Sequence, residues 1–345
     1  MDSKRPYRYS TLKQVLDRCP LYRVTCVVLA VFGMLLTMSC SWVKDDNDDC
    51  PYGFWLNLRY TYNILDVEAA PEYVKDVSVF VYDSVGNYVT RIDAPQTLLK
   101  TFSHRVRVEG LPEGDYQFVV WSGISNSNYA VSGDKQELSK FRLSLTEQES
   151  YADKLPDLFY GSLSTVHYDN AYATHDVFMM KNTNKLACVV VPLDDSQEMQ
   201  PDDYTMKIIT ANGTVNGWNK IVSDKLITYE PYTKDTVTVD DIDYGRLHGI
   251  KFGISTLRLM ENIDCRLVLE KNDTGESVFN VSFPEYIEMI GSLYTNLGRP
   301  LTVQEYLDRQ DFYTIVFFLS GNGLNQLLQL QVNSWRLRAY NHLKL

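Results

Sequence analysis

Apolar and polar positions alternate with a period of two along much of the chain from residue 53 onward. Leu56, Leu58, Tyr60 and Tyr62 fall on one side of the first such run and polar residues fall on the other, which predicts a strand with one buried face. The segment DSVGN (83–87) is typical of a turn and predicts a β-hairpin over residues 77–91. Further strands of this first half are predicted at 106–108, 116–121, 158–161 and 177–181.

A second set of apolar runs follows the turn-forming residues 182–184. Strands are predicted at 185–192, 205–210, 225–229, 236–239, 251–259, 264–271, 276–283, 312–319 and 327–337. Two helices are predicted, one over 286–293 and a short one that Thr302 caps, with Glu305 three residues later. Many short strands and little helix predict an all-β chain of two tandem antiparallel β-sandwiches, at 53–184 and 185–345.

The first 40 residues have a different pattern, an uncharged apolar run at 24–40 preceded by six basic and two acidic residues. This arrangement predicts a secretory signal peptide at 1–39. A transmembrane helix is the alternative, but it needs about 20 apolar residues and the run is shorter. The segment LTMSC (36–40) resembles a loose bacterial lipobox, in which Cys40 is acylated and becomes the mature N-terminus. Each buried methylene of an acyl chain contributes about 0.8 kcal/mol, so several chains would anchor the protein stably.

Residues 40–52 are predicted to form a lipidated acidic tether, because 41–49 carry little apolar area to bury. Asp45, Asn47 and Asp49 alternate like the start of a calcium-binding loop. The sixth position is Cys50 instead of Gly, and the twelfth is Leu56 instead of Glu. A solvated spacer is therefore the favoured interpretation of this segment.

Charge and cysteine content narrow the possible partners and crosslinks. The formal net charge is −11, and removal of the basic leader leaves −15 on the body, so nucleic acid is a poor partner. Cys188 and Cys265 lie in strand-like runs, where a disulfide between them and two buried free thiols are both open. If Cys40 carries lipid, Cys50, Cys188 and Cys265 are the three thiols of the mature body. An odd count leaves at least one of them unpaired.

Motifs of enzymes, cofactors and metals are missing from the sequence. The five histidines are scattered, and no H-E-x-x-H, G-x-S-x-G or phosphate-binding loop occurs. Asp240 and Asp241 form an acidic pair, for which a solvated loop is a better interpretation than acid–base chemistry. The sequence therefore predicts no catalytic residue, no cofactor and no metal site.

The order of the predicted strands resembles the FimB-type fimbrial subunit family of Bacteroidetes, the minor subunits that anchor type V pili. The resemblance spans nearly the whole mature chain and rests on Cys40 followed by short words in order: DCP (49–51), LRYTYN (58–63), VFVYD (79–83), LPEGDY (111–116), VWSG (120–123), LFYG (158–161), LRLM (257–260), QEYL (304–307) and VNSW (332–335). Two words depart mildly from the family pattern, because Ser122 replaces a Gly and Tyr82 replaces a Phe.

The resemblance implies a lipid-anchored fimbrial subunit of the outer membrane that faces the cell exterior. It would be the basal anchor or an accessory component, with fimbrial stalk or accessory subunits as partners. In this family a strand of one subunit completes the sandwich of the next by donor-strand exchange. Lys44, Asp45 and Asp46 resemble the acidic signal that sends such lipoproteins to the cell surface.

A rival hypothesis is a surface glycan-binding lipoprotein of a sugar-import system. Exposed aromatic platforms at Asn128-Tyr129 and at 168–172 would favour it. Trp121 and Trp335 could be interface anchors, but core positions are favoured for both because they alternate with apolar strand neighbours. The triplets DSV (83–85) and DTV (235–237) resemble the short O-glycan acceptor of this phylum.

Overall fold

The computed structural model describes residues 53–147, 149–169, 171–194, 198–291, 298–321, 326–333 and 335–338. Gly53–Leu345 forms one compact unit. The predicted signal peptide, Cys40, Cys50 and the tether lie outside the described residues. Strands dominate the described part, which confirms the all-β prediction.

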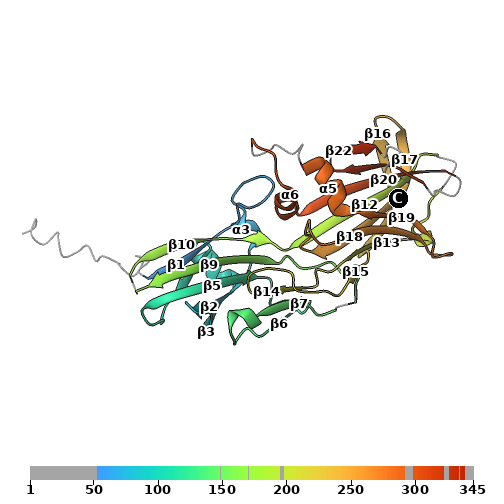
Figure 1. Ribbon diagram of the computed structural model, residues 1–345. Helices are drawn as coiled ribbons and strands as arrows, with labels where there is room; N and C mark the ends of the chain where they lie inside the picture. The colour runs from blue at the N-terminus through green and yellow to red at the C-terminus, as the bar shows by residue number, and fades with distance from the viewer. Residues whose placement is uncertain are drawn as a thin grey trace, which may run out of the picture. The chain divides into compact units, whose positions relative to one another are not determined.

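Two sheets make up what we call the N-terminal lobe, residues 53–122 and 155–181 (Figure 1). The first sheet has the order β10 (Ala173–Phe178), β1 (Phe54–Arg59), β4 (Arg105–Val108), and the second has the order β11 (Met180–Lys181), β9 (Phe159–Tyr168), β5 (Gly114–Ser122), β2 (Val77–Asp83), β3 (Tyr88–Ala94). The predicted hairpin over 77–91 is β2 paired with β3. Tyr116, Phe118 and Val120 share one face of β5 as predicted, and this face packs in the core between the two sheets.

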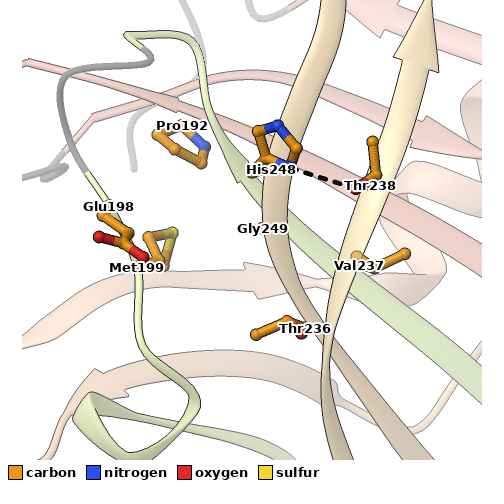
Figure 2. Close-up of a pocket in the computed structure, with 8 residues that line it drawn as sticks. All are labelled: Pro192, Glu198, Met199, Thr236, Val237, Thr238, His248 and Gly249. Atoms are coloured by element: carbon orange, nitrogen blue, oxygen red, sulfur yellow. Dashed lines mark hydrogen bonds between the residues drawn. The ribbon is translucent and has the colours of Figure 1, made fainter.

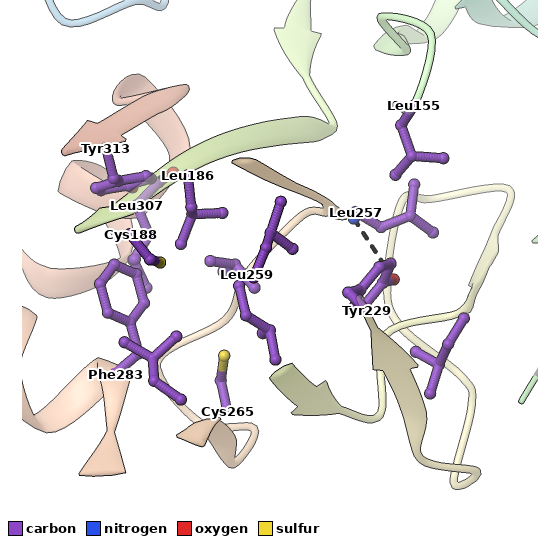
Figure 3. Packing of buried hydrophobic residues seen from close by; sticks show 14 of the residues in the cluster. Leu155, Leu186, Cys188, Tyr229, Leu257, Leu259, Cys265, Phe283, Leu307 and Tyr313 are labelled. Atoms are coloured by element: carbon purple, nitrogen blue, oxygen red, sulfur yellow. Dashed lines mark hydrogen bonds between the residues drawn. The ribbon is translucent and has the colours of Figure 1, made fainter. Parts of the chain in front are cut away.

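Two further sheets make up the C-terminal lobe, residues 183–338, and β8 (Ser150–Tyr151) of the first half joins one of them. One has the order β16 (Thr233–Asp241), β17 (Gly245–Leu257), β12 (Thr183–Pro192), β20 (Phe312–Ser320), β21 (Gln326–Val332), β22 (Trp335–Arg338), and the other has the order β19 (Ser277–Ser282), β18 (Cys265–Lys271), β13 (Tyr204–Thr210), β15 (Ile227–Tyr229), β8 (Ser150–Tyr151). Most pairs are antiparallel, whereas β1–β10, β12–β20 and β15–β8 are parallel. Figure 3 shows Leu186 and Cys188 of β12 directed into the core of this lobe.

A fifth sheet combines strands of both halves of the chain, with the order β14 (Thr214–Asn216), β7 (Arg142–Leu145), β6 (Tyr129–Ser132). Strands therefore cross the predicted boundary at residue 184 in both directions. β7 of the first half pairs with β14 of the second, and β8 of the first half pairs with β15 of the second. One apolar cluster also contains Trp121 and Phe141 together with Ile250 and Phe317. The division into two domains at residue 184 stays a prediction.

The helices are short: α3 (Ala70–Tyr73), α4 (Gln96–Thr101), α5 (Phe283–Gly291), α6 (Val303–Arg309) and the 3-10 turns η2 (Leu138–Lys140) and η3 (Pro201–Asp203). The predicted cap of α6 is confirmed, because the Glu305 amide donates to Thr302 Oγ1 at 3.1 Å. α5 begins three residues before its predicted start. Among the described residues no helix is long and apolar enough to cross a membrane.

Two parts of the strand prediction were wrong. Residues 327–337 form the hairpin β21–β22 instead of one strand, because the chain reverses at Asn333, whose φ is +53°. Asparagine tolerates this left-handed conformation better than most residues. The polar stretch 122–153, in which the sequence predicts no strand, contains β6, β7 and β8, which are only two to four residues long.

Candidate functional site

The residues considered for catalysis lie on β9, β16 and β17. His167 Nδ1 lies 2.8 Å from Asp115 Oδ1, a hydrogen bond that raises the pKa of His167, while His248 lies in β17 and contacts Thr238. Asp240 pairs with Arg246 at 3.0 Å, with both side chains mostly exposed. In the described part of the chain, no group of three or more His, Cys, Asp or Glu side chains could hold a metal ion.

The two described cysteines are free thiols inside the C-terminal lobe. Cys188 on β12 and Cys265 on β18 come from the two facing sheets and lie in the same apolar cluster (Figure 3). Burial raises the pKa of Cys265 to about 12 and raises the pKa of Cys188 as well. Of the two alternatives left open by the sequence, the structure has two buried, protonated thiols instead of a disulfide.

The aromatic residues proposed to bind sugars are mostly core residues. Tyr129 and Tyr168 are 6% and 1% exposed, and the Tyr129 hydroxyl donates to the carbonyl of Pro156. Tyr172 is 58% exposed. The predicted platform at Tyr129 and Tyr168 was therefore wrong, since a sugar cannot stack on a buried ring.

Trp121 is fully buried, as the core interpretation predicts. Its ring stacks on Phe141 with a centroid distance of 6.1 Å and an interplanar angle of 6°, and it contacts Tyr160 at 4.9 Å. Trp335 lies in β22, but its side chain is outside the described residues. Ser84 of the first triplet lies in the exposed β2–β3 turn, and Thr236 of the second is exposed on β16.

The start of β1 lies at the end of the N-terminal lobe that is remote from the C-terminal lobe. Phe54 pairs with Val108 and Ala173. The opposite end of this lobe continues into the C-terminal lobe, because Phe159 of β9 pairs with Lys181 of β11 and β12 follows directly. A pull on the chain at Gly53 therefore acts at one end of the described unit.

Arg309 of α6 contacts the loop that follows β1 and in this way connects the two lobes. Its guanidinium lies 4.3 Å from the centroid of the Tyr62 ring and donates to the carbonyl of Asn63 at 3.2 Å. It also pairs with Glu305 at 2.9 Å and with Asp66 at 3.4 Å. Because the Arg309 side chain is 10% exposed, water competes little for these contacts.

A second junction is centred on Lys181, whose side chain is 3% exposed. Its Nζ lies 2.7 Å from Asp311 of the C-terminal lobe and 3.2 Å from Asp157 of the N-terminal lobe. Burial acts to lower the pKa of Lys181, but the two carboxylates outweigh burial and the pKa is raised. Burial acts to raise the pKa of Asp157, but Lys181 and Lys185 lower it overall.

These pKa shifts predict a loss of stability in acid. A carboxylate whose folded pKa is depressed stabilises the fold above its unfolded pKa of about 3.9, and this contribution is lost as the pH falls through its folded pKa. We expect Lys181→Met to weaken the dependence of unfolding free energy on pH below about 4, because Asp157 then keeps only Lys185 as its partner. Denaturant unfolding of both proteins from pH 7 to pH 3 measures how the free energy of unfolding depends on pH.

Lys154 is exposed and lies three residues before Asp157. Lys154→Met is therefore the matched control, and it should keep the pH dependence of the unaltered protein. Identical acid limbs for the unaltered protein and for Lys181→Met would contradict the assigned role of Lys181.

A bidentate ion pair between Arg258 and Asp308, here called the fork, lies next to the Arg309 contact. Arg258 Nε and Nη2 donate to the two carboxylate oxygens of Asp308 at 2.7 and 2.8 Å, and the side chains are 13% and 6% exposed. Gln304 Nε2 also donates to Asp308 Oδ1 at 2.8 Å. These bonds hold α6 against the end of β17, so that Arg309 is presented to the N-terminal lobe.

Each sheet ends in edge strands with one unpaired row of backbone groups, among the pairings of the described residues. An unpaired edge can accept an added strand, with main-chain hydrogen bonds supplying affinity. The edge strands are β10, β4, β11, β3, β16, β22, β19, β8, β14 and β6. The sequence predicted strands in most of these places but could not order them, because order depends on pairings between distant segments.

Comparison with known proteins supplies the context for this geometry. The family model of the fimbrillin-A associated anchor proteins Mfa1 and Mfa2 matches residues 47–341. A comparison with curated proteins finds no match to this chain.

Solved structures with the same fold come from Bacteroides and Porphyromonas species. A candidate polysaccharide-binding protein of Bacteroides thetaiotaomicron is 26% identical with a TM-score of 0.72, and the match covers 84% of this chain and 98% of that one. A candidate adhesin of the same organism is 23% identical with a TM-score of 0.72, covering 83% and 97%. The fimbrial anchor protein Mfa2 of Porphyromonas gingivalis is 16% identical with a TM-score of 0.62, covering 84% and 99%.

Proposed function

Because this chain belongs to the family of fimbrillin-A associated anchor proteins Mfa1 and Mfa2, we propose that it is a lipid-anchored fimbrial subunit of the outer membrane. It would act as the basal anchor or an accessory component of a pilus and face the cell exterior. The observation that carries this proposal is the family match over residues 47–341, which includes both lobes.

Attachment is assigned to Cys40, acylated after removal of residues 1–39. Residues 40–52 would then tether the body, with a reach of at most about 45 Å when fully extended. The position of Gly53 at one end of the described unit suits this role, since the other end stays available for partners.

Assembly is assigned to strand addition between this chain and fimbrial stalk or accessory subunits. The support is the architecture itself, an all-β unit whose sheets end in unpaired edges among the described strands. Binding of this kind needs no catalytic group, which agrees with the family's structural and adhesive character. We therefore propose that the chain has no enzymatic activity.

Tension between membrane and pilus would cross the two lobes. Arg309 and Lys181 each connect the N-terminal lobe to the C-terminal lobe from sites that are almost closed to water. Shielded ion pairs lose less of their attraction to salt than exposed pairs do. The junction is therefore suited to keep the lobes together on a cell surface of variable ionic strength.

Glycan binding is the alternative function, favoured by the 26% identity to a candidate polysaccharide-binding protein. The burial of Tyr129 and Tyr168 weakens it. Saturable binding on a glycan array that disappears in Tyr172→Ala, together with unchanged fimbriae in a deletion strain, would favour the alternative over the anchor.

Cys40→Ala should release the protein from the membrane fraction and cause fimbriae to be shed into the medium. The physical reason is the loss of the acyl chains, without which the acidic body has no stable membrane attachment. Incorporation of labelled palmitate measures acylation, cell fractionation measures release from the membrane, and electron microscopy detects shed fimbriae.

Cys50→Ala is the matched control, because it removes a nearby thiol and leaves the lipidation site intact. It should keep palmitate, membrane association and fimbriae. A Cys40→Ala protein that still incorporates palmitate and stays in the outer membrane would contradict the proposal.

A further inference from the structure

β16 is the longest edge strand in the described part of the chain. All nine of its residues pair with β17, from Thr233 opposite Gly253 to Asp241 opposite Gly245. Among the described strands none pairs with its other side. No residue of β16 is buried, whereas its neighbour β17 is buried over most of its second half.

The middle of β16, residues 236–239, lacks the features that protect edge strands from pairing. Charged residues, prolines and bulges usually prevent an edge from accepting a strand. Lys234 and Asp235 lie at one end of β16 and Asp240 and Asp241 at the other, but 236–239 are Thr, Val, Thr and Val, and the pairing with β17 has no register shift. By contrast, the seven-residue edge strand β3 carries Arg91 and Asp93, and its partner ladder contains a bulge.

A hollow of about 450 Å³ lies beside this unprotected segment. It is lined by Thr236 and Thr238 of β16, His248 of β17 and Glu198 and Met199 of the loop after β12. Figure 2 shows His248 bonded to Thr238, with Glu198 on the far side of the hollow from β16. A strand added to the edge would place alternate side chains on the same face as Thr236 and Thr238.

We propose that the outer edge of β16, at residues 235–239, accepts a β-strand from a neighbouring fimbrial subunit, with a Lys or Arg side chain of that strand paired with Asp235. This proposal rests on the proposed function and names the edge at which strand addition occurs. Charge complementarity selects the occupant: Asp235 is exposed on the edge strand itself, and its cationic neighbour Lys234 is engaged with the carbonyl of Tyr204 at 2.7 Å. Main-chain bonds would supply affinity, and the hollow would supply specificity.

Proline can block the edge selectively. Along an antiparallel strand, successive residues direct their N–H groups alternately toward the partner strand and away from it. Of Val237→Pro and Thr238→Pro, one therefore removes an outward N–H and keeps the β17 ladder, whereas the other breaks the ladder. Thermal unfolding identifies the variant that keeps its stability, and that variant is the edge variant.

The experiment uses the body from residue 40 onward and fimbriae sheared from the producing strain as the probe. The edge variant should bind the fimbriae about tenfold more weakly or worse, because one main-chain hydrogen bond is lost and the ring blocks strand approach. The matched control is the stable member of the pair Val89→Pro and Thr90→Pro on edge strand β3, which should bind normally. Hydrogen exchange on the unaltered protein should show new protection of residues 236–239 in the complex.

Three outcomes would overturn the proposal. Normal binding by the edge variant, with no protection of 236–239, would remove β16 as the acceptor and leave the fimbrial function standing. Failure of the unaltered protein to bind fimbriae would count against both. Dimers of the purified body that disappear in the edge variant would show that the occupant is a second copy of this chain.

Discussion

Arg258→Met should lower the free energy of unfolding by about 3–5 kcal/mol, because it leaves the Asp308 carboxylate without its counter-charge in a site closed to water. Asp308 is 6% exposed and would keep only the amide of Gln304 as a described side-chain donor. Urea unfolding of the body from residue 40 onward measures the change.

The double variant Arg258→Met, Asp308→Leu should recover most of this loss, since replacing both members of a buried ion pair with apolar groups removes the stranded charge. Arg246→Met is the control. Its ion pair with Asp240 has side chains 70% and 76% exposed, so it should cost less than about 1 kcal/mol. A cost for Arg258→Met as small as that of the control would show that the fork contributes little.

Trp121→Ala should cost about 3–5 kcal/mol, because it opens a cavity where Phe141 and Tyr160 now pack on the indole. The variant should unfold at a lower urea concentration with a similar slope. It tests the core interpretation of this residue directly, because an exposed interface anchor would lose stability by only a few tenths of a kcal/mol.

Trp121→Phe is the comparison for Trp121→Ala, because it removes the indole N–H and keeps an aromatic ring. The indole Nε1 is buried with no hydrogen-bond partner in the described part of the structure, so its removal leaves no partner unsatisfied. The Phe variant should therefore lose clearly less stability than the Ala variant. Equal losses would indicate that packing volume is not what Trp121 contributes.

Much of the strand content could be predicted from the sequence, because alternation over five or more residues reports a strand with one buried face. β1, β2, β5, β12, β13, β18 and β20 all lie where alternation or apolar runs placed them. β6, β7 and β8 were missed because strands of two to four residues contain too few positions to show a period. The turn at Asn333 was missed because apolar residues continue on both sides of it.

The candidate sites were less predictable than the strands. Arg258, Asp308 and Arg309 have no sequence motif, and their roles arise only when α6 packs at the junction of the lobes. Tyr129 and Tyr168 were candidates for sugar binding because they lie in Tyr-rich segments, yet both side chains are buried. The edge position of β16 depends on the whole strand order, which no local pattern encodes.

The central strands of both lobes are completed by segments that are synthesised much later. Phe54 of β1 lies beside Ala173, and Lys185 of β12 lies beside Phe312. Such non-local contacts raise contact order and slow folding. A chain cut near residue 184 would also separate β7 from β14 and β8 from β15, so neither fragment should fold as it does in the intact protein. The nascent polypeptide should therefore stay incompletely folded until most of its length has been synthesised.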